Sequence, residues 1–105
     1  MIDYNSKRWE RKRERILKRD GYMCQESKRY GKRIDADMVH HIWPADEYPE
    51  YAWEDWNLIS LANSVHNKMH DRLTKKLTPL GDALRKRTPP PKDKNGSLQK
   101  PPLID

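Results

Sequence analysis

The sequence predicts a small α+β fold with an N-terminal helix, two short strands, a second helix and a disordered Pro-rich tail. Three observations support this fold class. Residues 6–19 have the composition and apolar spacing of a helix. Residues 34–42 and 56–61 have the pattern of short strands, and the chain from Thr88 onward offers almost nothing to bury. With 105 residues, the chain is long enough for one domain and too short for two ordinary ones.

The first helix is predicted over residues 6–19, which are mostly strong helix formers. Trp9, Ile16 and Leu17 are spaced so that they share one face. Gly21 occupies the usual glycine position just beyond a helix end, so we expect the helix to stop there.

The middle of the chain is predicted to form two strands separated by irregular segments. We expect a loop at residues 22–33, followed by a strand within residues 34–42, where apolar and polar residues alternate. Residues 43–55 contain two prolines and many acids, which predicts an irregular excursion. The segment "WNLISL" at residues 56–61 then predicts the second strand.

A second helix is expected from about Ser64 to Thr74, with Ser60 or Asn63 as its N-cap. Its apolar side would consist of Val65, Met69 and Leu73. A last helical turn is predicted to start at Thr78-Pro79, a capping residue followed by proline at the first helical position.

The composition predicts a thin core in a soluble, cytoplasmic protein. The hydrophobic fraction is 34% and Phe is absent, so the tryptophans should matter for folding, namely Trp9, Trp43, Trp53 and Trp56. The single cysteine, Cys24, excludes an internal disulfide. No apolar run approaches the roughly 20 residues that span a bilayer, and the charged N-terminus is unlike a signal peptide.

The charge balance favours a polyanionic partner. Lys and Arg outnumber Asp and Glu by 22 to 16, which gives a net charge of +6. Residues 7–19 and 28–33 are basic, whereas residues 46–55 are acidic. Any one of these segments taken alone is equally consistent with an ordinary solvated face.

All four histidines lie in two short motifs, "VHHIWP" at residues 39–44 and "HNKMH" at residues 66–70. On a helix, His66 and His70 would share a face with Cβ atoms about 5–6 Å apart and could chelate one metal ion. Such a pair also occurs by coincidence on helix surfaces. His40 and His41 are adjacent, so on a strand they point to opposite faces. One of them can therefore bind metal while the other faces a substrate.

These motifs, together with "RDGYMC" at residues 19–24 and "DWNLISL" at residues 55–61, resemble the HNH endonuclease family. The histidine arrangement is similar to that of colicin-type DNases and many phage HNH proteins. The resemblance implies a ββα-metal (His-Me finger) core at about 34–75. That core would lie within a nuclease domain at 1–87, with 88–105 as a flexible tail.

The resemblance also implies a role for each site residue. His40, His66 and His70 fall where the family has metal ligands, and His41 falls where it has the general base. Asn57 matches the family's central Asn, which holds the long loop and thereby the base, although it could also be an ordinary turn residue. The residue types suit this chemistry, because a neutral imidazole can take a proton from water near neutral pH.

One divalent ion per chain is expected. Three nitrogen ligands favour Zn, Ni, Co or Mn, and Mg stays open as the working ion. Many HNH proteins hold a second, structural zinc with two C-x-x-C pairs, but the corresponding positions here are Cys24, Ser27, Ala62 and Val65. We therefore expect no structural zinc, and apolar contacts among Cys24, Ala62, Val65 and nearby aromatics in its place.

The expected function is metal-dependent hydrolysis of double-stranded DNA, by nicking or cutting, with 5′-phosphate and 3′-OH products. The protein would act as a monomer, and similar phage proteins assist the terminase in DNA packaging, here in the host cytoplasm. The alternatives are a non-catalytic module whose four histidines hold a structural zinc, and a packaging factor with a vestigial nuclease. Adjacent histidines on a strand argue against a shared structural zinc.

The basic segments are expected to contact DNA phosphates. The candidate residues are Lys7, Arg8, Arg11, Lys12, Arg15, Lys28, Arg29, Lys68 and Arg72. The acidic excursion at residues 46–55 is expected to point away from the DNA.

Overall fold

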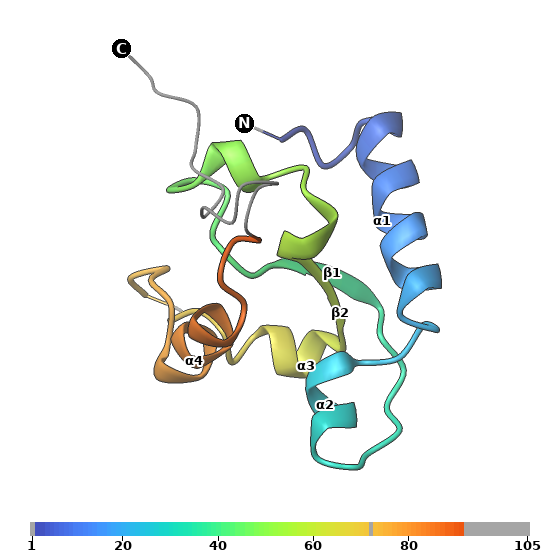
Figure 1. Ribbon diagram of the computed structural model, residues 1–105, viewed down its shortest axis with the longest axis vertical. Coiled ribbons are helices and arrows are strands. Elements are labelled where there is room, and N and C mark those ends of the chain that lie inside the picture. The colour runs from blue at the N-terminus through green and yellow to red at the C-terminus, as the bar shows by residue number, and fades with distance from the viewer. Residues whose placement is uncertain (1, 72, 92–105) are drawn as a thin grey trace.

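The computed structural model describes residues 2–71 and 73–91 and has the predicted α+β architecture (Figure 1). Its elements are α1 (Lys7–Arg19), α2 (Gln25–Arg29), β1 (Met38–His41), the 3₁₀ turns η1 (Pro49–Tyr51) and η2 (Asp55–Asn57), β2 (Leu58–Leu61), α3 (Asn63–His66) and α4 (Pro79–Arg87). The two strands pair antiparallel, with His41 opposite Leu58 and Met38 opposite Leu61. None of the helices in the described residues is long and apolar enough to cross a membrane.

Helix α1 forms as predicted and packs along the hairpin (Figure 1). The Ser6 hydroxyl caps its first turn by accepting the Trp9 N–H at 3.1 Å. Trp9, Ile16 and Leu17 are the buried residues of the helix, so the predicted apolar face is confirmed. The helix ends before Gly21, which has a positive φ of 65°.

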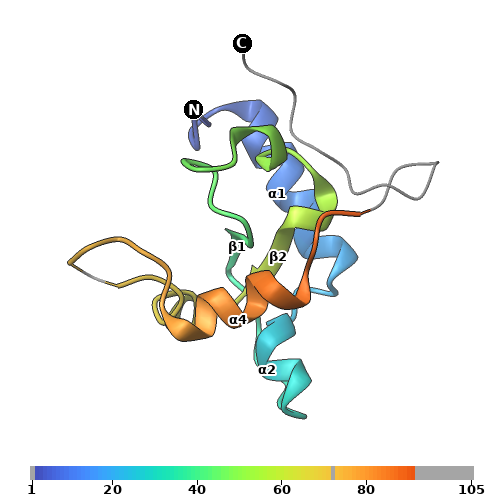
Figure 2. The same cartoon turned by 60° about the vertical axis from the view of Figure 1, so that its left-hand side comes forward.

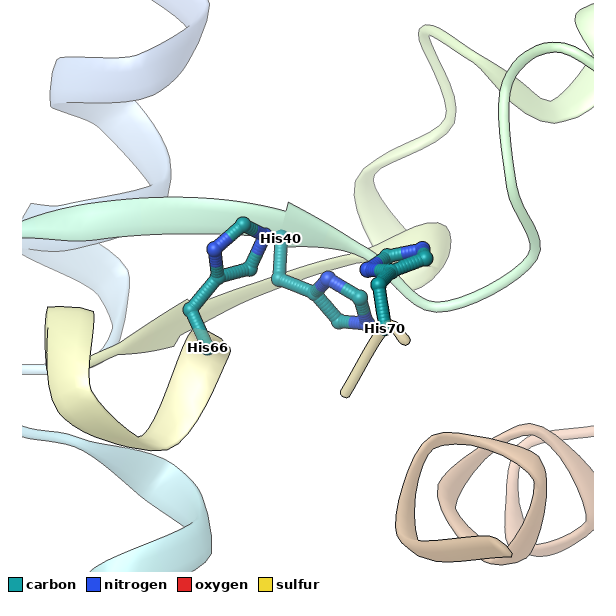
Figure 3. A group of neighbouring side chains, drawn as sticks. All are labelled: His40, His66 and His70. Atoms are coloured by element: carbon teal, nitrogen blue, oxygen red, sulfur yellow. The ribbon is translucent and has the colours of Figure 1, made fainter. Parts of the chain in front are cut away.

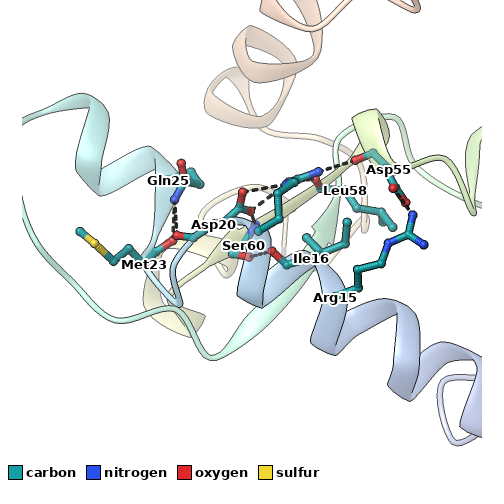
Figure 4. A network of polar contacts seen from close by, with 9 residues as sticks. Arg15, Ile16, Asp20, Met23, Gln25, Asp55, Leu58 and Ser60 are labelled. Carbon is teal, nitrogen blue, oxygen red and sulfur yellow. Dashed lines mark hydrogen bonds and ion pairs between the residues drawn. The ribbon is translucent and has the colours of Figure 1, made fainter.

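A polar network fixes the C-terminal end of α1 to β2 (Figure 4). The Asp20 carboxylate accepts the backbone N–H of Ser60 at 3.0 Å and the Nε–H of Arg19 at 2.8 Å. The Arg19 guanidinium also donates to the carbonyls of Asp55 at 2.8 Å and Leu58 at 2.7 Å. These contacts hold the start of β2 in place relative to α1.

The core consists of two apolar clusters. The first joins α1 to the hairpin and the long loop, through Ile2, Trp9, Ile16, Leu17, Val39, Ala52 and Leu58. The second joins α2, β2, the turn after α3 and α4, through Cys24, Ile42, Leu61, Ala62, Met69 and Leu84. Val65 and Trp43 pack against this second cluster, which confirms the predicted apolar contacts among Cys24, Ala62, Val65 and an aromatic residue.

The second helix is much shorter than predicted. It ends at His66 instead of near Thr74, because Thr78 bonds to the turn that follows. The Thr78 N–H donates to the Met69 carbonyl at 2.9 Å and its hydroxyl donates to the Lys68 carbonyl. These are the carbonyls that a longer helix would have used. Leu73, predicted on the apolar side of the helix, is 92% exposed.

The N-cap prediction for this helix was also wrong. Ala62 occupies the cap position, and neither Ser60 nor Asn63 caps the helix. The Asp37 carboxylate, 26 residues away in sequence, accepts the Asn63 N–H at 2.7 Å instead. A cap contributed from a distant segment leaves no local sequence signal.

Smaller differences occur elsewhere. The predicted loop at residues 22–33 contains the short helix α2, and the strand predicted within residues 34–42 is confined to Met38–His41. Helix α4 begins as predicted, with the Thr78 hydroxyl accepting the Gly81 N–H at 3.2 Å. In Figure 2 the segment between α3 and α4 projects away from the hairpin. Most of the predicted tail, from residue 92 onward, lies outside the described residues.

Candidate active site

The two adjacent histidines of β1 project to opposite sides of the strand, as their alternation predicts. The His41 ring stacks on Trp9 of α1, with centroids 5.4 Å apart and an interplanar angle of 18°. The His40 ring instead lies 5.1 Å from the His66 ring and 5.5 Å from the His70 ring. His41 thus packs against α1, whereas His40 packs against the other two histidines.

His40, His66 and His70 form a triad that could hold a metal ion (Figure 3). One ring nitrogen from each residue lies within 4.8 Å of the other two. His66 ends α3, and His70 follows a turn and forms an isolated β-bridge with Leu77. His66 and His70 were predicted to share one face of a helix. In the structure the helix ends at His66, and the turn that follows brings the His70 ring to the same side as the His66 ring.

The electrostatics of the triad suit a cation. His40 is 1% exposed, and within the described residues its Nε2 atom is buried without a hydrogen-bond partner. Burial, and secondarily the neighbouring histidines, lowers the pKa of His40 to about 3. Burial also lowers the pKa of His66 and of His70. The three imidazoles are therefore neutral near pH 7, with lone pairs free for a metal ion, and three nitrogen donors suit Zn, Ni, Co or Mn.

The His41 ring is held by the long loop. Its Nε2 lies 3.0 Å from the Ala52 carbonyl oxygen, so this nitrogen carries the proton and donates it. The other nitrogen, Nδ1, is left with the lone pair. Burial lowers the pKa of His41, while the bond to Ala52 and the Asp46 carboxylate oppose that shift. The ring is thus a neutral imidazole with a defined tautomer.

Asn57 closes the long loop on itself. Its side chain is fully buried. Its Oδ1 accepts the Trp43 N–H at 2.7 Å, and its Nδ2 donates to the carbonyls of Trp43 at 3.1 Å and Tyr51 at 3.0 Å. Because Ala52 directly follows Tyr51, these bonds also fix the carbonyl that orients His41.

The histidines from both sides of β1 line one pocket of about 360 Å³. Arg13 and Asp46 also line it, and neither was predicted as a site residue. Arg13 is the only Lys or Arg in the described lining, and it donates to the Asp37 carbonyl at 2.8 Å. Its place one helical turn after Trp9 was a usable signal, because residues four apart share a helix face. Asp46 belongs to the acidic excursion that was expected to point away from the DNA, and it lies in the pocket lining.

The predicted DNA contacts that the structure describes are not among the lining residues of this pocket. Lys12 and Arg15 form ion pairs with Asp55, and the Arg8 guanidinium lies 3.8 Å from the centroid of the Trp53 ring. Arg29 pairs with Glu26 at 3.0 Å. The exposed candidates for which no ion pair is seen in the described residues are Lys7, Arg8, Arg11, Lys28 and Lys68. Arg72 lies outside the described residues.

A search of solved structures finds an HNH endonuclease with the same fold. The crystal structure of the deep-sea thermophilic bacteriophage GVE2 HNH endonuclease with manganese ion matches this chain at 36% sequence identity and a TM-score of 0.59. The match covers 61% of this chain and 70% of that one. No family model and no curated protein matches the chain. The shared fold and sequence identity show that this chain belongs to the HNH endonuclease family and is a nuclease.

Proposed function

We propose that the chain is a metal-dependent endonuclease that hydrolyses phosphodiester bonds of double-stranded DNA. One observation carries the proposal: His41, whose Nε2 bonds to the Ala52 carbonyl, and a histidine triad whose ring nitrogens lie within 4.8 Å of one another line the same pocket. The manganese ion of the GVE2 enzyme supports a divalent metal at the triad. His40, His66 and His70 would hold it, and when bound it would offset negative charge on the phosphate and on the departing 3′ oxygen.

His41 would act as the general base. Its Nδ1 takes a proton from a water molecule while the water oxygen attacks phosphorus. The bond from phosphorus to the 3′ oxygen breaks, and that oxygen takes a proton from solvent, which leaves 5′-phosphate and 3′-OH ends. The Ala52 carbonyl stabilises the protonated ring, and the stacked Trp9 keeps its plane fixed.

Asn57 and Arg13 would support this step in different ways. Asn57 is a positioning residue, because it acts on His41 through the loop backbone. Arg13 is the one cationic side chain in the described pocket lining, and it would attract the phosphate that enters the pocket. The exposed cations of α1 would contact flanking phosphates, an interaction that salt weakens. Lys12 and Arg15 would contribute less, because Asp55 already neutralises part of their charge.

We propose a phage-encoded monomer that nicks DNA and works with the terminase in the host cytoplasm. A single active site per monomer supports nicking over double-strand cutting.

A plasmid assay tests the proposed chemistry. Supercoiled plasmid with Mn²⁺ should become nicked, and EDTA should prevent this. His41→Ala should lower the rate by about 10²–10⁴-fold while one metal ion per chain remains bound, because His41 lies apart from the triad. His70→Ala should lose both activity and metal.

A matched variant controls for general damage to the protein. Tyr30→Ala removes an aromatic that is 65% exposed and lines neither the pocket nor the triad, so its activity should match wild type. If His41→Ala lost the metal as well, the separation of base and ligands would be wrong. If wild type left the plasmid intact with every divalent ion tried, the chain would not be a DNA nuclease.

A further inference from the structure

A second hollow of about 430 Å³ lies beside the catalytic pocket. Ile2 and Tyr4 contribute to it from the segment before α1, and Ala45, Ala52 and Trp53 contribute from the long loop. Figures 1 and 2 both show the N-terminal segment close to this loop. The hollow has no role in the hydrolysis described above.

The hollow adjoins the catalytic pocket. Tyr4, Ala45 and Asp46 line both spaces. The Tyr4 ring centroid lies 6.3 Å from the His41 ring and 5.2 Å from the Trp9 ring. A strand whose phosphate lies against His41 must therefore place a neighbouring nucleoside next to the hollow.

The lining chemistry matches a nucleobase better than a phosphate. In the part of the chain that the structure describes, no Lys or Arg lines the hollow, whereas Arg13 lines the catalytic pocket. Tyr4 and Trp53 supply aromatic surface on which a base can stack, and the remaining walls are largely apolar. Asp46 adds a hydrogen-bond acceptor, which suits the amino group of cytosine or adenine.

We propose that this hollow takes up one unstacked nucleobase next to the cleaved phosphodiester. The inference rests on the proposed nuclease function and adds a preference to it. A base inside a perfect duplex is stacked and paired, so it must leave the stack to enter, which is least costly at a mismatch, a frayed end or a single strand. The enzyme should therefore cut most rapidly where the base beside the cut is unpaired.

An abasic-site scan tests the proposal with wild-type protein alone. Single-stranded oligonucleotides with one mapped cut are prepared so that a single abasic site occupies each flanking position in turn, and kcat/KM is measured with Mn²⁺. One position next to the cut should show a loss of roughly tenfold, because one base–aromatic stacking contact is removed. The other positions should stay within about twofold of the intact strand.

A variant assigns that loss to the hollow. Tyr4→Ala removes one wall, so the intact strand should be cut more slowly and the abasic strand should show little further loss. Tyr4 is 55% exposed, which makes the change tolerable for folding. The matched control is Tyr30→Ala, which is 65% exposed and lines neither space, and it should keep the full tenfold sensitivity.

Several results would overturn the proposal. A flat scan in an active wild-type enzyme would do so while leaving the nuclease function intact. If Tyr4→Ala lost as much kcat/KM at the abasic position as wild type does, the nucleobase would bind somewhere other than this hollow. A flat scan with dimers in analytical ultracentrifugation would assign the hollow to a second copy of the chain. Failure to cut single strands by an enzyme that still nicks plasmid would overturn the base-uptake proposal alone, whereas failure to cut both would overturn the nuclease function as well.

Discussion

The two sides of β1 reach their working geometry by different means. On the His41 side, a hydrogen bond, a stacked tryptophan and a loop closed by Asn57 hold the ring without any ligand. On the triad side, His40 is fully buried with an unpartnered Nε2, and α3 has four residues and no side-chain cap from its own N-cap residue. Folding alone therefore positions the His41 ring, whereas a bound cation would supply the partner that His40 Nε2 lacks among the described residues.

This difference has an energetic consequence. A buried nitrogen without a partner costs about 1–3 kcal/mol, so the triad lowers the stability of the metal-free protein. The His41 side carries no comparable cost, because its Nε2–H is paired. Substitutions on the two sides should therefore change stability in opposite directions when metal is absent.

The largest expected effect is the loss of the Asn57 side chain. Asn57→Ala removes the partner of the Trp43 N–H and one donor each to the Trp43 and Tyr51 carbonyls in a buried site, so the free energy of unfolding should fall by about 2–4 kcal/mol. Activity should also fall at temperatures where the variant stays folded, because the Ala52 carbonyl is released. Urea unfolding and the plasmid assay measure these quantities.

The surface variant Asn67→Ala is the matched control for Asn57→Ala, because Asn67 is exposed, and it should change stability little. If Asn57→Ala had wild-type stability, the long loop would not be what holds the His41 side of β1.

Cation binding should give the next largest change in the free energy of unfolding. This change should depend on the triad histidines. At a free Mn²⁺ concentration of about 100 times Kd, the free energy of unfolding should rise by about 2.7 kcal/mol. Chelation should reverse this gain but leave the far-ultraviolet circular dichroism intact, because the apolar clusters do not depend on the ion. His70→Ala should abolish the gain. Loss of the helical signal with EDTA would show that the cation holds the fold.

The local features of the fold could be predicted from the sequence. Helix α1 follows from strong helix formers and three apolar residues on one face, and Asn57 and the four histidines lie in recognisable motifs. Features set by distant contacts could not be predicted. The helix predicted from about Ser64 to Thr74 ends at His66, because Thr78 donates hydrogen bonds to the carbonyls of Lys68 and Met69.

The same limit applies to the site. Asp46 reaches the pocket because of the path of the long loop, which is fixed by bonds between Asn57 and two loop carbonyls. Its acidic sequence context indicated a solvated face instead. Arg13 lies among many basic residues of α1, so composition alone did not distinguish it. Its spacing from Trp9 was the informative feature.

A smaller effect should distinguish the two sides in the absence of metal. His40→Leu replaces the unpartnered imidazole with an apolar side chain, so the metal-free protein should gain about 1 kcal/mol. His41→Leu removes the donor to the Ala52 carbonyl and should lose about 1 kcal/mol or more. Paired urea titrations in EDTA measure both changes. If both variants lost stability equally, the proposed difference between the two sides would not exist.

The smallest expected effect concerns the network at the end of α1, which supports the His41 side through β2. Burial alone would raise the pKa of Asp20, but hydrogen bonds from Arg19 and Ser60 outweigh it and lower that pKa below its usual value. A carboxylate with a lowered folded pKa stabilises the protein above its unfolded pKa of about 3.9, and this contribution disappears as pH falls through the folded value. Asp20→Asn should therefore cost about 1 kcal/mol at pH 7. The difference in stability between wild type and variant should begin to narrow below about pH 4, and it should close once pH falls below the folded pKa of Asp20, because both side chains are then neutral. Comparing the two proteins at each pH cancels the titration of all other shared groups. A gap that stays constant down to pH 2.5 would mean that the Asp20 charge contributes nothing to holding β2 against α1.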